Sequence, residues 1–244
     1  FRKSKFSKQS YPSSMMGSMA LIRQVFHDAK WYAQGSATNK DLSLEAFNTN
    51  KSLLQIINAG DKLNNLRAAK LGDEFGIKYL IKGGGNEFEL IDEIKKTAAT
   101  YIIPLNFPDA YDVSDSFLAE QVVLSDMKFW NQAPYNLKVL AENNVNFALT
   151  TADLKNPKDF LTNLRKAVEY GLPKEKALAA LTEIPAKIAN QNNIGTLKKG
   201  NLANFIIVSG DIFESKSSIQ ENWIQGNRNI IEKIQPSDIR GKYE

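Results

Sequence analysis

The sequence predicts an α/β fold in which parallel strands alternate with helices, followed by a small all-β unit. Three observations support this prediction. Short apolar runs recur along the chain, and each ends at turn-forming residues such as Gly, Pro, Asn or Asp. Stretches with helical spacing of apolar residues separate these runs. The runs are apolar throughout rather than alternating, which is typical of parallel strands covered on both faces.

The N-terminal part is predicted to be helical. Apolar residues recur at helical spacing from Met15 to about Trp31, and Ser13 or Ser14 is a suitable N-cap for this helix. A second short helix is expected around residues 42–48.

Four βα units are predicted next. Their strands are expected at residues 53–57, 77–81, 100–103 and 146–150. Their helices are expected at about 61–75, 87–96, 120–131, 134–142, 157–170 and 173–181. Beyond residue 197 the character of the sequence changes. Residues 205–208 and 219–224 are predicted strands of the β unit, with a turn at 225–227.

The number of βα units indicates half of a (β/α)8 barrel. A complete barrel of this kind takes about 250 residues, whereas the repeating pattern here covers residues 53–181. We therefore expect a partial TIM-type barrel in residues 1–194 and strands of a small β-sandwich in residues 195–244. A half barrel exposes apolar strand edges, so a missing N-terminal half or a second copy of the chain is expected to cover them.

The composition argues against several functions. The 244 residues include 31 basic and 27 acidic ones without a basic stripe or recognition motif, so nucleic-acid binding is not indicated. The chain has no cysteine, which excludes disulfides and thiolate metal sites. No apolar run approaches the roughly 20 residues needed to span a bilayer, so no membrane span is expected.

Residues 172–211 carry the most specific motif. The motif includes Ala177-Leu178, Thr182, Pro185-Ala186-Lys187, Ile194-Gly195, Leu197, Gly200 and Ala203-Asn204. At these spacings the segment resembles the C-terminal signature of the amidohydrolase superfamily, the imidazolonepropionase-like and dihydroorotase-like metal hydrolases. The resemblance implies barrel strands five to eight, followed by sandwich strands, at the C-terminal portion of a longer protein. By resemblance alone, an exported or periplasmic location is expected.

The family activates water with one or two metal ions, and an Asp after strand eight takes the proton. This chain contains one histidine, His27, which lies in a predicted helix without a second nearby ligand and is interpreted as structural. The resemblance places two ligand histidines at Asn58 and Gly84, so neither is kept. Zinc or another divalent metal is therefore expected only if its ligands come from the missing N-terminal half.

Four residues near predicted strand ends are candidate substrate contacts. Asn58 can hydrogen-bond a substrate or simply form a turn. Gly84 lies in a glycine run that either presents N–H groups to an anionic group or forms a tight turn. Asn106, in the long loop after the third strand, and Thr151, after the fourth, complete the set.

Asp153 is the candidate general base. An ungapped comparison with the family pattern places its Asp at Ala152, one residue earlier. Because side chains alternate along a strand, this shift would point Asp153 away from the barrel axis, unless a bulge restores its direction.

Two functions follow from the resemblance. One is hydrolysis of a non-peptide C–N bond, in a small amide or cyclic amide, by metal-activated water. The alternative is a catalytically degenerate barrel that acts as a binding or scaffold domain.

Overall fold

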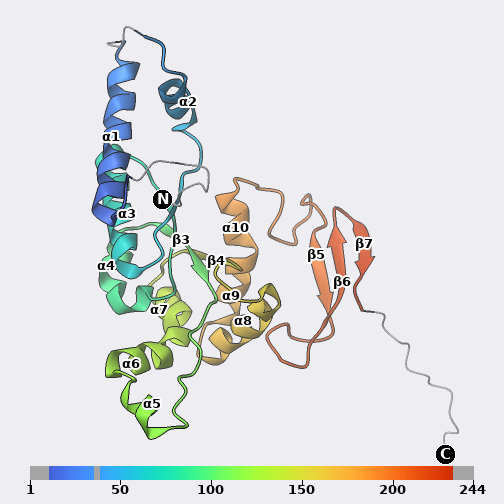
Figure 1. The fold of residues 1–244 in the computed structure, drawn as a ribbon. Helices are drawn as coiled ribbons and strands as arrows, with labels where there is room; N and C mark the ends of the chain where they lie inside the picture. Colours follow the sequence, from blue (N-terminus) through green and yellow to red (C-terminus); the bar gives the residue numbers. More distant parts are fainter. Residues whose placement is uncertain (1–10, 36–38, 233–244) are drawn as a thin grey trace, which may run out of the picture.

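The computed structural model describes residues 11–35 and 39–232, which form a mixed α/β fold with two separate sheets (Figure 1). The first sheet has four parallel strands, which are β1 (Ile56–Asn58), β2 (Leu80–Lys82), β3 (Thr100–Pro104) and β4 (Phe147–Thr150). The second sheet has three antiparallel strands, which are β5 (Phe205–Val208), β6 (Ile219–Ile224) and β7 (Asn227–Ile230).

Helices precede, connect and follow the parallel strands. The α-helices are α1 (Met15–Ala33), α2 (Leu42–Asn50), α3 (Lys62–Phe75), α4 (Ile91–Lys96), α5 (Ser116–Glu120), α6 (Leu124–Gln132), α7 (Asn136–Glu142), α8 (Phe160–Glu169), α9 (Lys174–Leu181) and α10 (Glu183–Ile188). Three short 3₁₀ helices are η1 (Glu87–Leu90), η2 (Ala133–Tyr135) and η3 (Pro157–Asp159).

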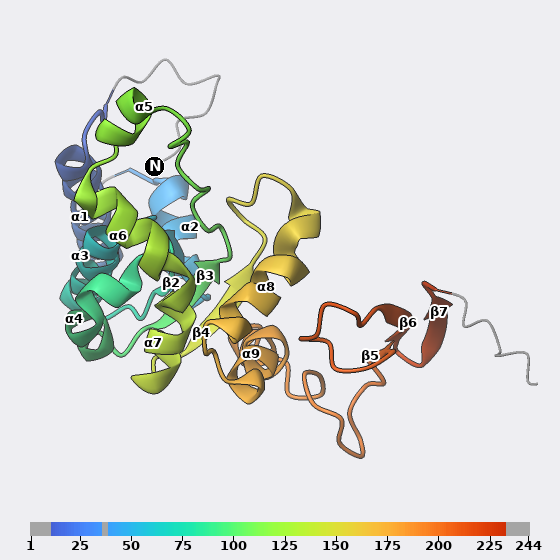
Figure 2. The same ribbon diagram turned by 90° about the horizontal axis from the view of Figure 1, so that it is seen from below.

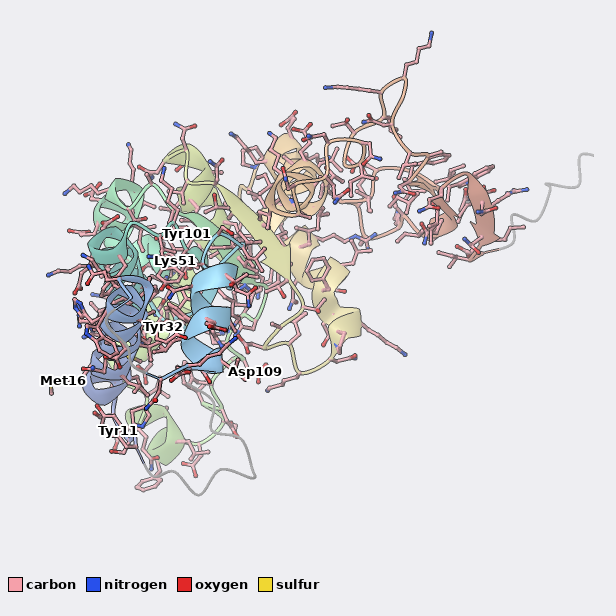
Figure 3. The ribbon with its side chains drawn as sticks, turned by 90° about the horizontal axis from the view of Figure 1, so that it is seen from above. Tyr11, Met16, Tyr32, Lys51, Tyr101 and Asp109 are labelled. Carbon is pink, nitrogen blue, oxygen red and sulfur yellow. The ribbon has the colours of Figure 1, made fainter. Side chains whose placement is uncertain are left out.

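The parallel sheet has the order β1-β2-β3-β4, so chain order and spatial order agree. Ile57, Ile81, Tyr101 and Phe147 are in register across the four strands, and their side chains therefore share one face. This face packs into the hydrophobic core, where Ile81 and Tyr101 are fully buried. Tyr101 is labelled in Figure 3. Burial of such apolar rows is the main force that holds the helices on the sheet.

The next register row lies on the opposite face and closer to the ends of the strands. It consists of Asn58, Lys82, Ile102 and Ala148. Two polar side chains therefore stand next to each other where β1 and β2 end.

The predicted alternation of strands and helices is confirmed, and the differences have local causes. The first strand begins at Ile56 rather than at residue 53. Helix α10 was not predicted because it contains Pro185, but a proline in the first turn of a helix removes no intrahelical hydrogen bond. Strand β7 was not predicted because only one of its four residues is apolar.

Helices α1 and α2 pack together next to α3 (Figure 1). Phe26 stacks on Phe75 of α3, with ring centroids 4.4 Å apart, and meets Phe47 of α2 edge-on. Tyr32 lies between α1 and α2, and its hydroxyl donates to Glu45 (Figure 3). Ser14, one of the two predicted caps, accepts a hydrogen bond from the N–H of Gly17.

The small antiparallel sheet lies beyond α8 and α9, away from the parallel sheet (Figures 1 and 2). Arg165 of α8 donates to the carbonyl oxygens of Ile212 and Ser217, at 2.9 and 2.7 Å. Lys174 of α9 forms an ion pair with Asp211. These contacts tie the loop between β5 and β6 to the helices of the first part.

The stability of the small sheet is expected to depend on pH through Glu221. Hydrogen bonds from Arg228 and Trp223 lower the pKa of this carboxyl below its ordinary value of 4.5. A carboxyl with a lowered pKa in the folded state stabilises the fold at higher pH, and this contribution is lost as the pH falls through the folded pKa. Glu221→Gln should therefore reduce the loss of stability at low pH, in a plot of the free energy of unfolding against pH. Unfolding is followed by Trp223 fluorescence. If stability falls as steeply at low pH in the variant as in the wild type, other carboxyls cause the fall.

Strand β1 is an outer strand, and its exposed surface is apolar. Ile56 is 60% exposed, and Leu53 and Leu54 before it are also exposed. Such an edge is a site for pairing with another chain segment. Among the described helices, none is long and apolar enough to cross a membrane.

Candidate functional site

The carboxyl ends of the four parallel strands meet along one edge of the sheet, which we call the carboxyl edge. The strands end there at Asn58, Lys82, Pro104 and Thr150. Loops that follow the ends of parallel strands are the usual place for binding and catalysis in α/β folds. Polar groups that meet at this edge are therefore the candidates for function.

An ion pair between Lys82 and Asp153 spans the carboxyl edge. Lys82, the last residue of β2, donates from Nζ to Oδ2 of Asp153, which follows β4. The side chain of Lys82 is 14% exposed, the lowest value for a basic residue in any ion pair of the described residues. Sequence reasoning missed Lys82, and the signal was a lysine that ends the apolar run Leu80-Ile81.

A turn directs Asp153 towards Lys82. Strand β4 ends at Thr150, whose Oγ1 accepts the N–H of Ala152 at 3.1 Å, and the N–H of Leu154 donates to the carbonyl of Thr151. Asp153 itself has φ +67°, a left-handed conformation that Asp tolerates better than most residues. The side-chain alternation of the strand stops at Thr150, so the turn takes the place of the bulge that the sequence suggested.

Glu87 is a fully buried carboxylate held by four N–H donors. Its Oε1 accepts from the side chain of Asn65 at 3.0 Å and from the N–H groups of Gly84 and Gly85 at 2.9 and 3.3 Å. Its Oε2 accepts from the side chain of Asn136 at 2.7 Å. The anionic group that the glycine turn holds therefore belongs to the chain itself.

The other candidate contacts differ in their surroundings. Asn58 is exposed at the end of β1 and is the register neighbour of Lys82. Asn106 has a buried Oδ1 without a hydrogen-bond partner among the described residues. Thr151 is exposed, and its carbonyl belongs to the turn before Asp153. The structure thus places Asn58 beside Lys82 in the sheet, and Thr151 in the turn that carries Asp153.

A hollow of about 510 Å³ lies beside Asp153, between the loops after β3 and β4. Its lining includes Asn106, Phe107, Trp130, Asp153, Lys155 and Lys166. The ammonium of Lys166 lies 5.4 Å from the ring centroid of Phe107, which is within cation–π range. Asp109, labelled in Figure 3, forms an exposed ion pair with Lys155 in this lining. The volume suits a small organic ligand.

Another hollow, of about 420 Å³, lies at the opposite, amino-terminal end of the strands. Leu80, Thr100, Asn146 and Ile184 are among its lining residues. We favour the hollow at the carboxyl edge as the functional one, because only that end of the sheet carries Lys82 and Asp153.

The comparisons with known proteins agree with the motif in residues 172–211. Residues 113–231 match the model of the amidohydrolase family. No curated protein matches the chain. This match, over residues 113–231, is to the same family that the motif predicted.

Several solved structures share the fold. An amidohydrolase from Thermotoga maritima MSB8 is similar with a TM-score of 0.70 at 21% identity, over 89% of this chain and 56% of that one. A Xaa-Pro dipeptidase with bound methionine has a TM-score of 0.53 at 18% identity, over 77% and 47%. Ochratoxinase from A. niger has a TM-score of 0.50 at 19% identity, over 81% and 47%. The chain thus spans about half the length of these structures.

The residues at the carboxyl edge do not fit the divalent metal that this family implies. Among the described residues, no three His, Asp or Glu side chains are grouped as metal ligands. A divalent ion on Asp153 would face the ammonium of Lys82, and at 4 Å and an effective dielectric constant of 20 their repulsion is about 8 kcal/mol. Glu87 is saturated by its N–H donors, and His27 packs edge-on against Phe75 in another part of the fold.

Proposed function

We propose that residues 1–194 are a partial (β/α)8 barrel, equivalent to barrel strands five to eight, and that residues 195–244 contribute strands of a small β-sandwich. The parallel order of the four strands and the amidohydrolase neighbours support this proposal. The exposed apolar edge at Ile56 supports a partner that continues the sheet, either an N-terminal half or a second copy of the chain.

Within this architecture we propose that the protein hydrolyses a non-peptide C–N bond in a small amide or cyclic amide. The observation that carries the proposal is the carboxylate of Asp153 in the wall of a ligand-sized hollow at the carboxyl edge. Asp153 takes a proton from the attacking water as its oxygen bonds to the carbonyl carbon, and returns it to the leaving nitrogen when the C–N bond breaks. Asn106 lines the same hollow and is proposed as a substrate contact.

Asn58, Gly84 and Thr151 take smaller parts in this proposal. Asn58 is exposed and free to contact a substrate that reaches β1. The N–H of Gly84 is engaged by Glu87, so Gly84 acts by shaping the loop. Thr151 contributes the turn that positions Asp153.

The alternative is a catalytically degenerate barrel that binds a ligand or serves as a scaffold. Two observations favour it. The ammonium of Lys82 holds the carboxylate that would act as base, and the buried carboxylate of Glu87 already accepts hydrogen bonds from the protein's own donors. The hydrolase and the scaffold function both predict ligand binding in the hollow beside Asp153, and only the hydrolase predicts turnover.

Asp153→Asn is expected to lower kcat at least about 100-fold, with little change in KM, because general-base catalysis contributes factors of this size. The assay is hydrolysis of a panel of N-acyl amino acids and cyclic imides, and the metal content of the purified protein is measured in parallel. Asp109→Asn is the matched control, since Asp109 lines the same hollow but pairs with Lys155. Equal rates in wild type and Asp153→Asn would refute the assigned role. Absence of turnover together with ligand binding would support the scaffold function.

A further inference from the structure

We infer that Lys82 supplies the positive charge that faces Asp153 at the carboxyl edge, in place of a divalent cation. The side chains of this chain then hold no metal ion at that position. The inference rests on the proposed function only in taking Asp153 as a site residue, and it does not require hydrolysis.

The position of Lys82 makes it part of the site. Lys82 shares a register row with Asn58, Ile102 and Ala148, so its side chain leaves the sheet on the same face as that of Asn58. It reaches from β2 to the turn after β4, past the end of β3, over a separation of 71 residues in the sequence. This contact links β2 to the turn after β4 across the carboxyl edge.

The low exposure of Lys82 makes it depend on Asp153, whose own side chain is 49% exposed. At 14% exposure, its side chain has lost most of its contact with water, and an ammonium in such a place requires an anionic partner. Asp153 is the carboxylate that pairs with it within the described residues. The turn around Asp153, with its left-handed backbone, fixes the carboxylate where Lys82 reaches it.

The neighbouring positions cannot add the ligands that a metal ion would need. A Cβ atom at Gly84 would lie 2.0 Å from the carbonyl oxygen of Gly60, so any side chain there forces two loops apart. Glu87 already accepts four hydrogen bonds. Asn58 offers only an amide, a poor ligand for zinc. A zinc site needs three or four good ligands, and the carboxyl edge offers Asp153 alone.

Zinc titration tests the inference directly. Isothermal calorimetry and thermal unfolding with Zn²⁺ and Mn²⁺ should show no saturable 1:1 binding by the wild-type chain. The double variant Asn58→His/Lys82→His should bind one Zn²⁺ and unfold at a higher temperature with Zn²⁺ than without, because adjacent strands lie about 5 Å apart and both imidazoles would join Asp153 on one face. Lys82→Met is the matched control, since it removes the ammonium without adding a ligand, and it should stay metal-free.

Two outcomes would overturn the inference. One is 1:1 binding of Zn²⁺ or Mn²⁺ by the wild type that Asp153→Asn abolishes. The other is a folded Asn58→His/Lys82→His variant that binds no zinc.

If that variant does not fold, the stabilities of single and double variants show whether Lys82 and Asp153 are coupled. Asp153→Asn should raise the equilibrium constant of unfolding more than Lys82→Met/Asp153→Asn does, because only the single variant leaves the ammonium unpaired. Additive effects would mean that the two residues are not coupled. None of these readouts depends on turnover.

Discussion

Replacement of Glu87 by alanine is expected to destabilise the protein by about 4 kcal/mol, a large share of the stability of an ordinary domain. The carboxylate accepts hydrogen bonds from Asn65, Asn136 and the N–H groups of Gly84 and Gly85. Both asparagines are buried, so water cannot replace the lost acceptor. Each buried donor left without a partner costs about 1–3 kcal/mol. Urea unfolding followed by circular dichroism measures the loss.

Two further variants serve as controls for Glu87→Ala. Glu89→Ala removes a carboxylate from the same 3₁₀ helix, but Glu89 is exposed and pairs with Lys62. It should cost less than about 1 kcal/mol. Glu87→Gln keeps the shape of the side chain and turns one acceptor into a donor, so an intermediate loss is expected. If Glu87→Ala is as stable as Glu89→Ala, the buried network does not hold the loops together.

The sequence predicted the elements of the parallel sheet because their signals are local. Asp61 accepts the N–H of Asn64 at the start of α3, and Gly76 ends that helix with a left-handed backbone, as their residue types indicated. The apolar runs predicted the strands for the same reason. Boundaries moved by a few residues because the register with neighbouring strands, and not composition, decides where a strand begins.

The site was predicted only in part because its contacts join distant residues. Asp153 was found from its place after an apolar run, but its partner Lys82 lies 71 residues away, and only the parallel order of the strands brings the two together. Glu87 likewise meets Asn65 and Asn136, at separations of 22 and 49 residues. A sequence read in short windows does not show which distant residues meet. A basic residue at the end of an apolar strand was the one local hint.

The same long-range geometry makes Gly84 the site of the second large effect, and both Gly84→Ala and Gly84→His are expected to cost about 3 kcal/mol or more. The loops after β1 and β2 touch at this point, where a Cβ atom would lie 2.0 Å from the carbonyl oxygen of Gly60 and 3.3 Å from the Cα of Asp61. Because the first carbon of the side chain already clashes with backbone, alanine should be nearly as harmful as histidine. Urea unfolding of the two variants checks this expectation.

Gly60→Ala is the matched control, because it lies on the other side of the same contact. Its Cβ would meet nothing within 4 Å, and its φ of +81° alone should cost about 1–2 kcal/mol. If Gly84→Ala is tolerated better than Gly60→Ala, the two loops can separate, and a histidine at position 84 could then approach Asp153 as a metal ligand. If Gly84→Ala is the more harmful change, close backbone contact requires glycine here. The fold then excludes histidine at position 84, and a single substitution there cannot restore a metal ligand.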